Sequence, residues 1–312
     1  MRTIGRAVGL FALIAFALAI GCDSGTTTSS STSGGPSTAP ASHPGKAAAL
    51  RFSAIPDQNS TELKEKFEAL AVHLSQKLGV PVQYVPATDY KASVEMFKNG
   101  DIRLAWFGGL TGVQARRAVP GARAIAQGDS DPTFVSYFVA NAAAPIEPSE
   151  SFPADLGKLS FTFGPASSTS GRLMPEYFIR QNTGKSPAEF FGREPAFSEG
   201  HDKTLELVEA GKVQAGVVNF EVYDKRVEDK KTDPARVRVI WRTPKYADYN
   251  FTAHPDLDRD HGAGFIDKLQ TALIAVDDPK LLSAFPRTKL IPAKNEDYEQ
   301  IEQVAKELGF LR

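Results

Sequence analysis

Strand and helix patterns alternate along most of this 312-residue chain, and this alternation is what most limits the folds it can adopt. Leu63, Phe67, Leu70 and Leu74 recur at helical spacing, while the apolar run before them is typical of a strand and ends at Pro56. The elements expected in the first half are a strand at 49–55, a helix at 61–78, a strand at 80–85, a helix at 89–100 and a strand at 102–107. Such alternation predicts an α/β fold with a mainly parallel sheet and helices on both of its faces.

The same alternation returns after a proline-containing break at 141–153. The elements expected there are strands at 158–163, 213–218 and 237–241 and helices at 170–181, 201–210, 265–274 and 297–308. We therefore expect two α/β lobes, with residues 49–141 and about 245–312 in lobe I and residues 142–244 in lobe II. A cleft between two lobes is where small ligands usually bind.

The first 21 residues have the pattern of a secretory signal peptide. The apolar run from Val8 to Ile20 follows two arginines and is too short to cross a hydrocarbon core of about 30 Å. Cys22 is the only cysteine, which excludes an intramolecular disulfide and a cysteine-based metal cluster. Its position after "AIG" resembles a bacterial lipobox, which would make Cys22 the lipidated first residue. The alternatives are ordinary secretion and an uncleaved anchor.

Residues 22–48 are rich in Ser, Thr, Gly and Pro, so we expect a flexible tether between a lipidated Cys22 and the folded body. The whole chain has 36 basic and 37 acidic residues. Removing residues 1–21 removes two arginines and no acid, which leaves a net charge of −3. A nucleic-acid partner would favour a basic stripe, so this balance argues against one.

A run of four hydroxyl residues, 167–170, stands where a helix is expected to begin. A helix N-terminus offers unpaired N–H groups and a partial positive charge, and both attract anions. Ser168, Thr169 and Ser170 would add side-chain donors, and Gly171 would let the backbone approach closely. The alternative is an ordinary helix cap, worth about 1 kcal/mol. Because one cap needs only one hydroxyl, the run favours an anion site.

Other strand-to-helix turns carry further polar groups, and we considered whether they support catalysis. Ser170 lacks the G-x-S-x-G pattern of a nucleophile elbow, and the five histidines show no close metal-ligand spacing. His201 could donate to an oxyanion or lie on the surface, and Asp202 is better explained as a first-turn acid. The turn Phe107, Gly108 and Gly109 ends a strand, and its glycines permit a tight turn with exposed N–H groups. We therefore expect no enzyme, no metal and no cofactor.

Four ordered segments resemble the phosphate-, phosphite- and phosphonate-binding proteins of ABC importers, which are two-lobed periplasmic binding proteins of type II. The segments are "DYKASVEMFKNGDIRLAWFGG", "GPASSTSGRLMPEYF", "FSEGHDKTLELVEAGKVQAGVVNFEVYD" and "IPAKNEDYEQIEQVAKELGF". Within the family, "FSAIPDQN" and "AIAQGDSD" look closest to a branch labelled selenate-binding. Many members have an aromatic-glycine-proline turn where this chain has Phe107, Gly108 and Gly109.

The resemblance implies a lipid-anchored binding protein on the extracytoplasmic face of a bacterial membrane. It would deliver a small tetrahedral oxyanion, selenate in the main reading, to an ABC permease and ATPase, and would act as a monomer. The alternatives are a phosphonate, phosphite or phosphate binder and a sensory lipoprotein of the same fold. The predicted ligand-binding residues are Tyr90, Phe107, Gly108, Gly109, Ser168, Thr169, Ser170, Gly171 and His201.

The identity of the anion depends on whether the site contains a hydrogen-bond acceptor. A monoprotonated phosphate or phosphonate has an O–H group to donate, whereas selenate and sulfate at neutral pH have none. A site with an inward-facing Asp57, Asp89 or Glu221 would therefore favour a protonated ligand. A site made of donors alone would favour selenate or sulfate.

Overall fold

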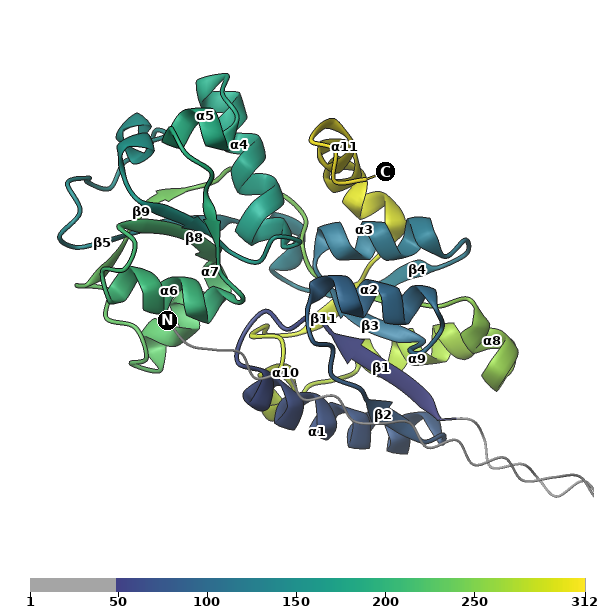
Figure 1. Cartoon of the computed structure of the whole chain (residues 1–312). Coiled ribbons are helices and arrows are strands. Elements are labelled where there is room, and N and C mark those ends of the chain that lie inside the picture. Colours follow the sequence, from purple (N-terminus) through teal and green to yellow (C-terminus); the bar gives the residue numbers. More distant parts are fainter. Residues whose placement is uncertain (1–48, 312) are drawn as a thin grey trace, which may run out of the picture. The chain divides into compact units, whose positions relative to one another are not determined.

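Two β-sheets with helices on their faces make up residues 49–311, the part of the chain that the computed structural model describes (Figure 1). The predicted signal peptide, Cys22 and the tether up to residue 48 lie outside these described residues. Within residues 49–311, no helix has both the length and the apolar character needed to cross a membrane.

The first sheet has six strands in the order β11, β4, β10, β3, β1 and β2. Their bounds are β1 (Leu50–Ala54), β2 (Val82–Tyr84), β3 (Leu104–Phe107), β4 (Arg123–Gly128), β10 (Asn250–Ala253) and β11 (Leu290–Pro292). Strand β1 pairs in parallel with β2 and β3, whereas β10 runs antiparallel to both β3 and β4. Strand β11 is also antiparallel to β4. The strands β1, β2, β3 and β4 therefore point one way, and β10 and β11 point the other way.

The second sheet has five strands in the order β7, β6, β8, β5 and β9. Their bounds are β5 (Ser136–Asn141), β6 (Phe161–Phe163), β7 (Ala196–Phe197), β8 (Ala215–Asn219) and β9 (Val237–Arg242). Strand β5 is antiparallel to both neighbours, β8 and β9, and the other four strands share one direction. Each sheet is therefore mainly parallel with respect to strand direction, as predicted.

Helices cover both faces of each sheet (Figure 1). The helices near the first sheet are α1 (Ser60–Leu78), α2 (Tyr90–Lys98), α3 (Gly109–Ala118), α8 (Asp256–His261), α9 (Phe265–Ile274), α10 (Pro279–Leu282) and α11 (Glu299–Glu307). Those near the second sheet are α4 (Met174–Thr183), α5 (Pro187–Phe191), α6 (His201–Glu209) and α7 (Phe220–Glu228). Short 3₁₀ turns lie at Asp131–Thr133, Ala154–Lys158 and Asn295–Tyr298, and a π-helical turn lies at Thr169–Leu173.

Helix α1 illustrates why the predicted elements form. Asn59 accepts the N–H groups of Thr61 and Glu62, and Gly79 ends the helix in the left-handed conformation that glycine adopts without strain. The predicted apolar positions, including Leu63 and Phe67, are buried. The α/β fold class that the sequence predicts is therefore confirmed.

The chain passes from the first sheet to the second earlier than expected. Strand β5 pairs with β8 and β9, so the crossing lies between Gly128 and Ser136, and the expected boundary near residue 142 is wrong for this strand. The return crossing lies between Arg242 and Asn250. Both crossing segments lead into or out of antiparallel strands, which the expected alternation of parallel strands did not include.

Candidate functional site

The hydroxyl run follows strand β6 and forms the first turn before α4. Ser168 accepts the N–H of Gly171 at 2.9 Å, and its carbonyl accepts the N–H of Leu173 at 3.0 Å, which makes this turn π-helical. Ser168, Thr169 and Ser170 are at most 2% exposed. Ser168 thus acts as the cap, and the hydroxyls of Thr169 and Ser170 are not needed for capping.

The side chain of Thr169 contacts the N-terminus of α3, a helix that packs near the first sheet. The N–H of Leu110 donates to Thr169 Oγ1 at 2.9 Å, and the N–H of Gly109 donates to Asp248 Oδ1 at 2.8 Å. The predicted glycine turn and the predicted hydroxyl run therefore meet, although they lie on different sheets. The partial positive charge of the α3 N-terminus faces this junction.

His201 is the first residue of α6 and is fully buried. Its Nδ1 accepts the backbone N–H of Asn219 at 3.2 Å, and its Nε2 lies 3.5 Å from Ser168 Oγ. Because Nδ1 is an acceptor, a neutral ring carries its hydrogen on Nε2. Burial lowers the pKa of His201 to about 3, so the ring offers this donor toward Ser168 without a charge.

Tyr90 begins α2, whose cap is Asp89, which accepts the N–H of Ala92 at 2.8 Å. The Tyr90 side chain is buried. Burial, and then the nearby carboxyl groups of Asp57 and Asp248, raise the pKa of the Tyr90 hydroxyl well above its ordinary value. Tyr90 therefore stays protonated and keeps a donor available.

Three buried polar atoms around this junction have no hydrogen-bond partner among the described residues. They are Tyr90 Oη, Ser170 Oγ and Asp248 Oδ2. Buried polar atoms are nearly always paired in folded proteins, so each such atom requires an explanation. The two hydroxyls can donate, and an ionised carboxylate oxygen can accept. This is the set of partners that a protonated oxyanion requires.

Asp248 is the residue that the sequence reasoning missed. It is 1% exposed, and burial raises the pKa of its carboxyl to about 7. It precedes β10, and β10 runs antiparallel to β3, so the beginning of β10 lies beside the end of β3. Strand-to-helix turns mark the sheet edge only for strands that point toward it. An antiparallel strand delivers residues to the same edge from its opposite end.

Asp57, one of the three carboxylates considered as acceptors for a protonated ligand, is buried beside Tyr249. It accepts the Tyr249 hydroxyl at 2.8 Å, and Tyr249 in turn accepts the side-chain N–H of Asn219 at 2.9 Å. The Asp57 carbonyl accepts the N–H of His201 at 2.9 Å, which links the two sheets. Burial raises the pKa of Asp57 to about 6.

Several predicted groups lie elsewhere or are already paired. Phe107 packs in the core against Phe97, with ring centroids 5.7 Å apart. The Gly171 N–H is taken by Ser168. Glu221 accepts the Ser130 hydroxyl at 2.6 Å.

Arg172, which follows the hydroxyl run, is paired with Glu176 at 2.5 Å. In residues 49–311 no group of three or more His, Cys, Asp or Glu side chains is placed to hold a metal ion.

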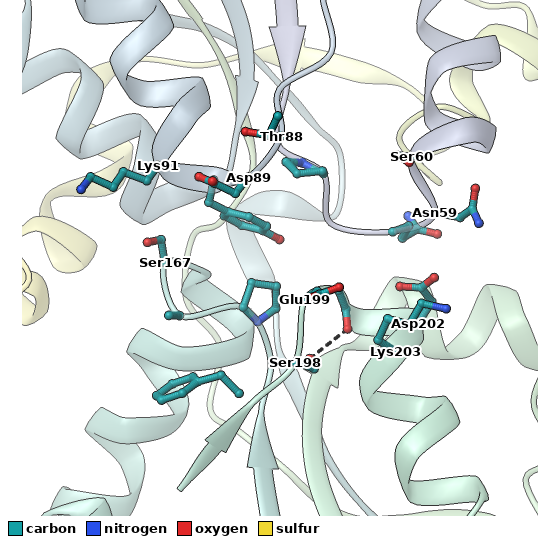
Figure 2. Close-up of a pocket in the computed structure, with 17 residues that line it drawn as sticks. Asn59, Ser60, Thr88, Asp89, Lys91, Ser167, Ser198, Glu199, Asp202 and Lys203 are labelled. Carbon is teal, nitrogen blue, oxygen red and sulfur yellow. Dashed lines mark hydrogen bonds between the residues drawn. The ribbon is translucent and has the colours of Figure 1, made fainter. Parts of the chain in front are cut away.

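A cavity of about 830 Å³ lies directly outside this buried junction. Figure 2 shows residues of the first sheet's loops facing residues of the second sheet's loops across it. The labelled side chains are Asn59, Ser60, Thr88, Asp89 and Lys91 on one side and Ser167, Ser198, Glu199, Asp202 and Lys203 on the other. Tyr90, whose buried hydroxyl belongs to the junction, is also among the residues that line the cavity. We call this space the mouth cavity.

Two mixed α/β sheets whose loops meet at a junction of helix N-termini define a two-lobed solute-binding protein. Residues 52–298 match a family described as "ABC transporter, phosphonate, periplasmic substrate-binding protein". The chain belongs to this family, whose members bind substrates outside the cytoplasm and are not enzymes, as predicted.

Individual relatives agree with the family assignment. The chain is 37% identical to a probable ABC transporter phosphite binding protein, PhnD1, of Prochlorococcus marinus, over 84% of this chain and 91% of that protein. It is 29% identical to the phosphate-import protein PhnD of Mycolicibacterium smegmatis, over 71% and 70% of the two chains. A solved structure of the Prochlorococcus PhnD1 with methylphosphonate matches with a TM-score of 0.79 and 36% identity, over 84% of this chain and 98% of that one.

Proposed function

We propose that this protein captures phosphite or a small phosphonate as a protonated anion and delivers it to an ABC permease. The observation that carries the proposal is the set of three unpartnered atoms, Tyr90 Oη, Ser170 Oγ and Asp248 Oδ2, two of which donate and one of which accepts. The neutral His201 Nε2–H adds a further donor, and the partial positive charge of the α3 N-terminus faces the same junction.

This proposal replaces selenate, the main reading of the sequence, with the alternative that it left open. Selenate at neutral pH has no proton to offer the Asp248 carboxylate, so it would place two negative groups in contact. A monoprotonated phosphonate or phosphite would instead donate its O–H to Asp248 Oδ2. The names of the relatives, which refer to phosphite, phosphate and methylphosphonate, support the same class of ligand.

The burial of the junction favours a small ligand. Ser168, Thr169, Ser170 and Asp248 are each at most 2% exposed, and only Tyr90 also lines the mouth cavity. We propose that residues on the two sheets move apart to admit the anion and that an organic substituent would point past Tyr90 into the mouth cavity. The hydrogen bond from Leu110 N–H to Thr169 Oγ1 would form on closure.

We further propose that the protein works as a monomer held to the membrane by a lipid on Cys22. The pattern before Cys22 and the polar segment 22–48 support the lipid anchor. A Cys22→Ser variant should appear in the soluble fraction of fractionated cells, whereas the unchanged protein should stay with the membranes. Equal distribution of the two proteins would contradict the anchor.

We expect phosphite and methylphosphonate to raise the thermal midpoint most in a panel with phosphate, sulfate, selenate and selenite. At one hundred times the dissociation constant, a ligand adds about 2.7 kcal/mol to the free energy of unfolding. Thr169→Ala and Ser170→Ala should each weaken methylphosphonate binding by about 1–3 kcal/mol. Ser170 Oγ has no partner within residues 49–311, so Ser170→Ala should leave the ligand-free stability nearly unchanged.

Ser167→Ala provides the matched control, because Ser167 belongs to the same hydroxyl run but lines the mouth cavity. It should bind methylphosphonate within about threefold of the unchanged protein. Unchanged affinity in both the Thr169 and the Ser170 variants would rule out this site. A panel in which no anion raises the midpoint would rule out the proposed function.

A further inference from the structure

Arg116 is a partly buried cation on the same helix whose N-terminus faces the candidate site, and its Nη2 atom is buried. Its Nη1 donates to Asn250 Oδ1 at 3.1 Å and to Thr252 Oγ1 at 2.9 Å, and its guanidinium carbon lies 4.8 Å from the ring centre of Tyr298. All of these partners are uncharged.

Arg116 has no carboxylate within 4 Å among residues 49–311, and its Nη2 has no hydrogen-bond partner there. Two other arginines, in contrast, have carboxylate partners. Arg117 pairs with Glu302 at 2.9 Å, and Arg287 pairs with Asp131 at 2.6 Å. Burial lowers the pKa of Arg116 to about 10, against the opposing effect of Tyr298, Glu302 and Asp297. The guanidinium therefore remains charged at neutral pH.

The guanidinium folds back along α3 toward the helix N-terminus, as helical side chains generally do. A β-carbon added to Gly112 would lie 2.9 Å from Arg116 Nη1 and 2.8 Å from Asn250 Nδ2. Gly112 itself donates its N–H to the carbonyl of Gly108 and closes the first turn of α3. A β-carbon at 112 would displace the Arg116 guanidinium or the Asn250 amide from this turn, to which the N–H groups of Gly109 and Leu110 also belong.

We infer that Arg116 is the counter-ion of the bound anion and acts through the first turn of α3 without touching the ligand. This inference rests on the proposed function. A partly buried charge without a carboxylate partner is unfavourable, and an anion on the other side of the turn would offset that cost. The direct partners of the anion are neutral donors and a carboxylate, so Arg116 supplies the compensating positive charge. It is a positioning residue that raises affinity in proportion to the charge of the ligand.

Arg116→Gln should weaken methylphosphonate binding about tenfold to thirtyfold, the effect expected from a unit charge acting across several Å of protein. Arg116→Lys, which keeps the charge, should stay within about threefold of the unchanged protein. Arg117→Gln removes an exposed charge from the next position and should also stay within about threefold. Isothermal titration should be run below and above the second ionisation of methylphosphonate, since the loss in Arg116→Gln should be larger for the dianion. A purely structural role would weaken both ionisation states equally.

Asn250→Asp tests the same charge with Arg116 in place, and it keeps the size of the side chain. The new carboxylate would pair with Arg116, so the thermal midpoint of the ligand-free protein should rise while methylphosphonate affinity falls about tenfold. Unchanged affinity in Asn250→Asp, or equal losses in Arg116→Gln and Arg116→Lys, would overturn the inference. If the unchanged protein bound no tetrahedral anion, the proposed function itself would fail. Normal binding in the unchanged protein and in every variant would overturn only the role of Arg116.

Discussion

Asp248→Asn should invert the anion preference of this protein. Asp248 Oδ1 accepts the N–H of Gly109 at 2.8 Å, and an asparagine oxygen can keep that bond. The amide nitrogen would then replace Oδ2, the atom that has no partner among the described residues. A donor would thus stand where the O–H of a protonated phosphite or phosphonate needs an acceptor. We expect the affinity for phosphite and methylphosphonate to fall about 100-fold or more, because two donors would face each other in a buried site.

Fully ionised sulfate and selenate should gain affinity in the same variant, since the new amide would donate to them and a negative charge would be gone. Titration of methylphosphonate and sulfate against both proteins at pH 7.5, above the pKa of about 7 at which Asp248 ionises, measures the change in preference. Asp202→Asn is the control, because Asp202 lines the mouth cavity and lies in the first turn of α6. Equal weakening of both anions in Asp248→Asn would mean that Asp248 supports the structure without selecting the ligand.

The pH dependence of stability provides a second measurement on Asp248. The unfolded carboxyl loses its proton near pH 3.8, whereas the buried one keeps it up to about pH 7. The folded protein therefore holds an extra proton at Asp248 in this window, and the contribution of Asp248 to stability is fully present below about pH 4 and is lost as the pH rises through 7. One unit of pKa shift corresponds to about 1.4 kcal/mol. Asp248→Asn should flatten this slope, and Asp57, with a pKa of about 6, should account for part of what remains. An unchanged slope in denaturation experiments would contradict the assignment.

Much of the fold could be predicted because helices and parallel strands carry strong local patterns. The positions of α1, α2, β3 and α9 were expected within a few residues. The short antiparallel strands were not expected, since β10 has only four residues and all of them are buried, so no alternation of polar and apolar residues marks it. The sequence also contains no local signal for the chain crossing before β5.

The candidate site was partly predictable for a related reason. Tyr90, Ser168 and His201 each follow a strand or begin a helix, and helix N-termini can be recognised from sequence. Asp248 could not be found in this way, because it reaches the site through the reversed direction of β10. The sequence also did not indicate the direction of side chains. Phe107 ends β3, as expected, but its side chain points into the core and packs against Phe97.

Gly164→Val should abolish detectable methylphosphonate binding and should destabilise the protein, although it removes no polar atom. Gly164 donates its N–H to the carbonyl of Gly171 at 2.9 Å, so the strand end and the hydroxyl turn are joined directly. A β-carbon on Gly164 would lie 2.9 Å from Gly171 Cα and 3.5 Å from His201 Cε1. The nearest atom belongs to the backbone and cannot rotate away, so the turn that holds Ser168 must shift.

Overpacking of a buried position costs about 1–3 kcal/mol for small additions, and valine adds two carbons beyond the first clash. We expect the affinity for methylphosphonate to fall at least about 100-fold, because a displacement of about 1 Å is enough to misplace several hydrogen bonds at once. Ala166→Val is the control, since Ala166 belongs to the same turn but is exposed, and its affinity should stay within about threefold. Gly164→Ala, with one added carbon, gives a measurable intermediate if the valine variant does not fold. Methylphosphonate binding by a folded Gly164→Val protein at the affinity of the unchanged protein would show that the anion does not depend on this turn. The donors of Ser168, Thr169 and Ser170 would then have to be assigned to the structure alone.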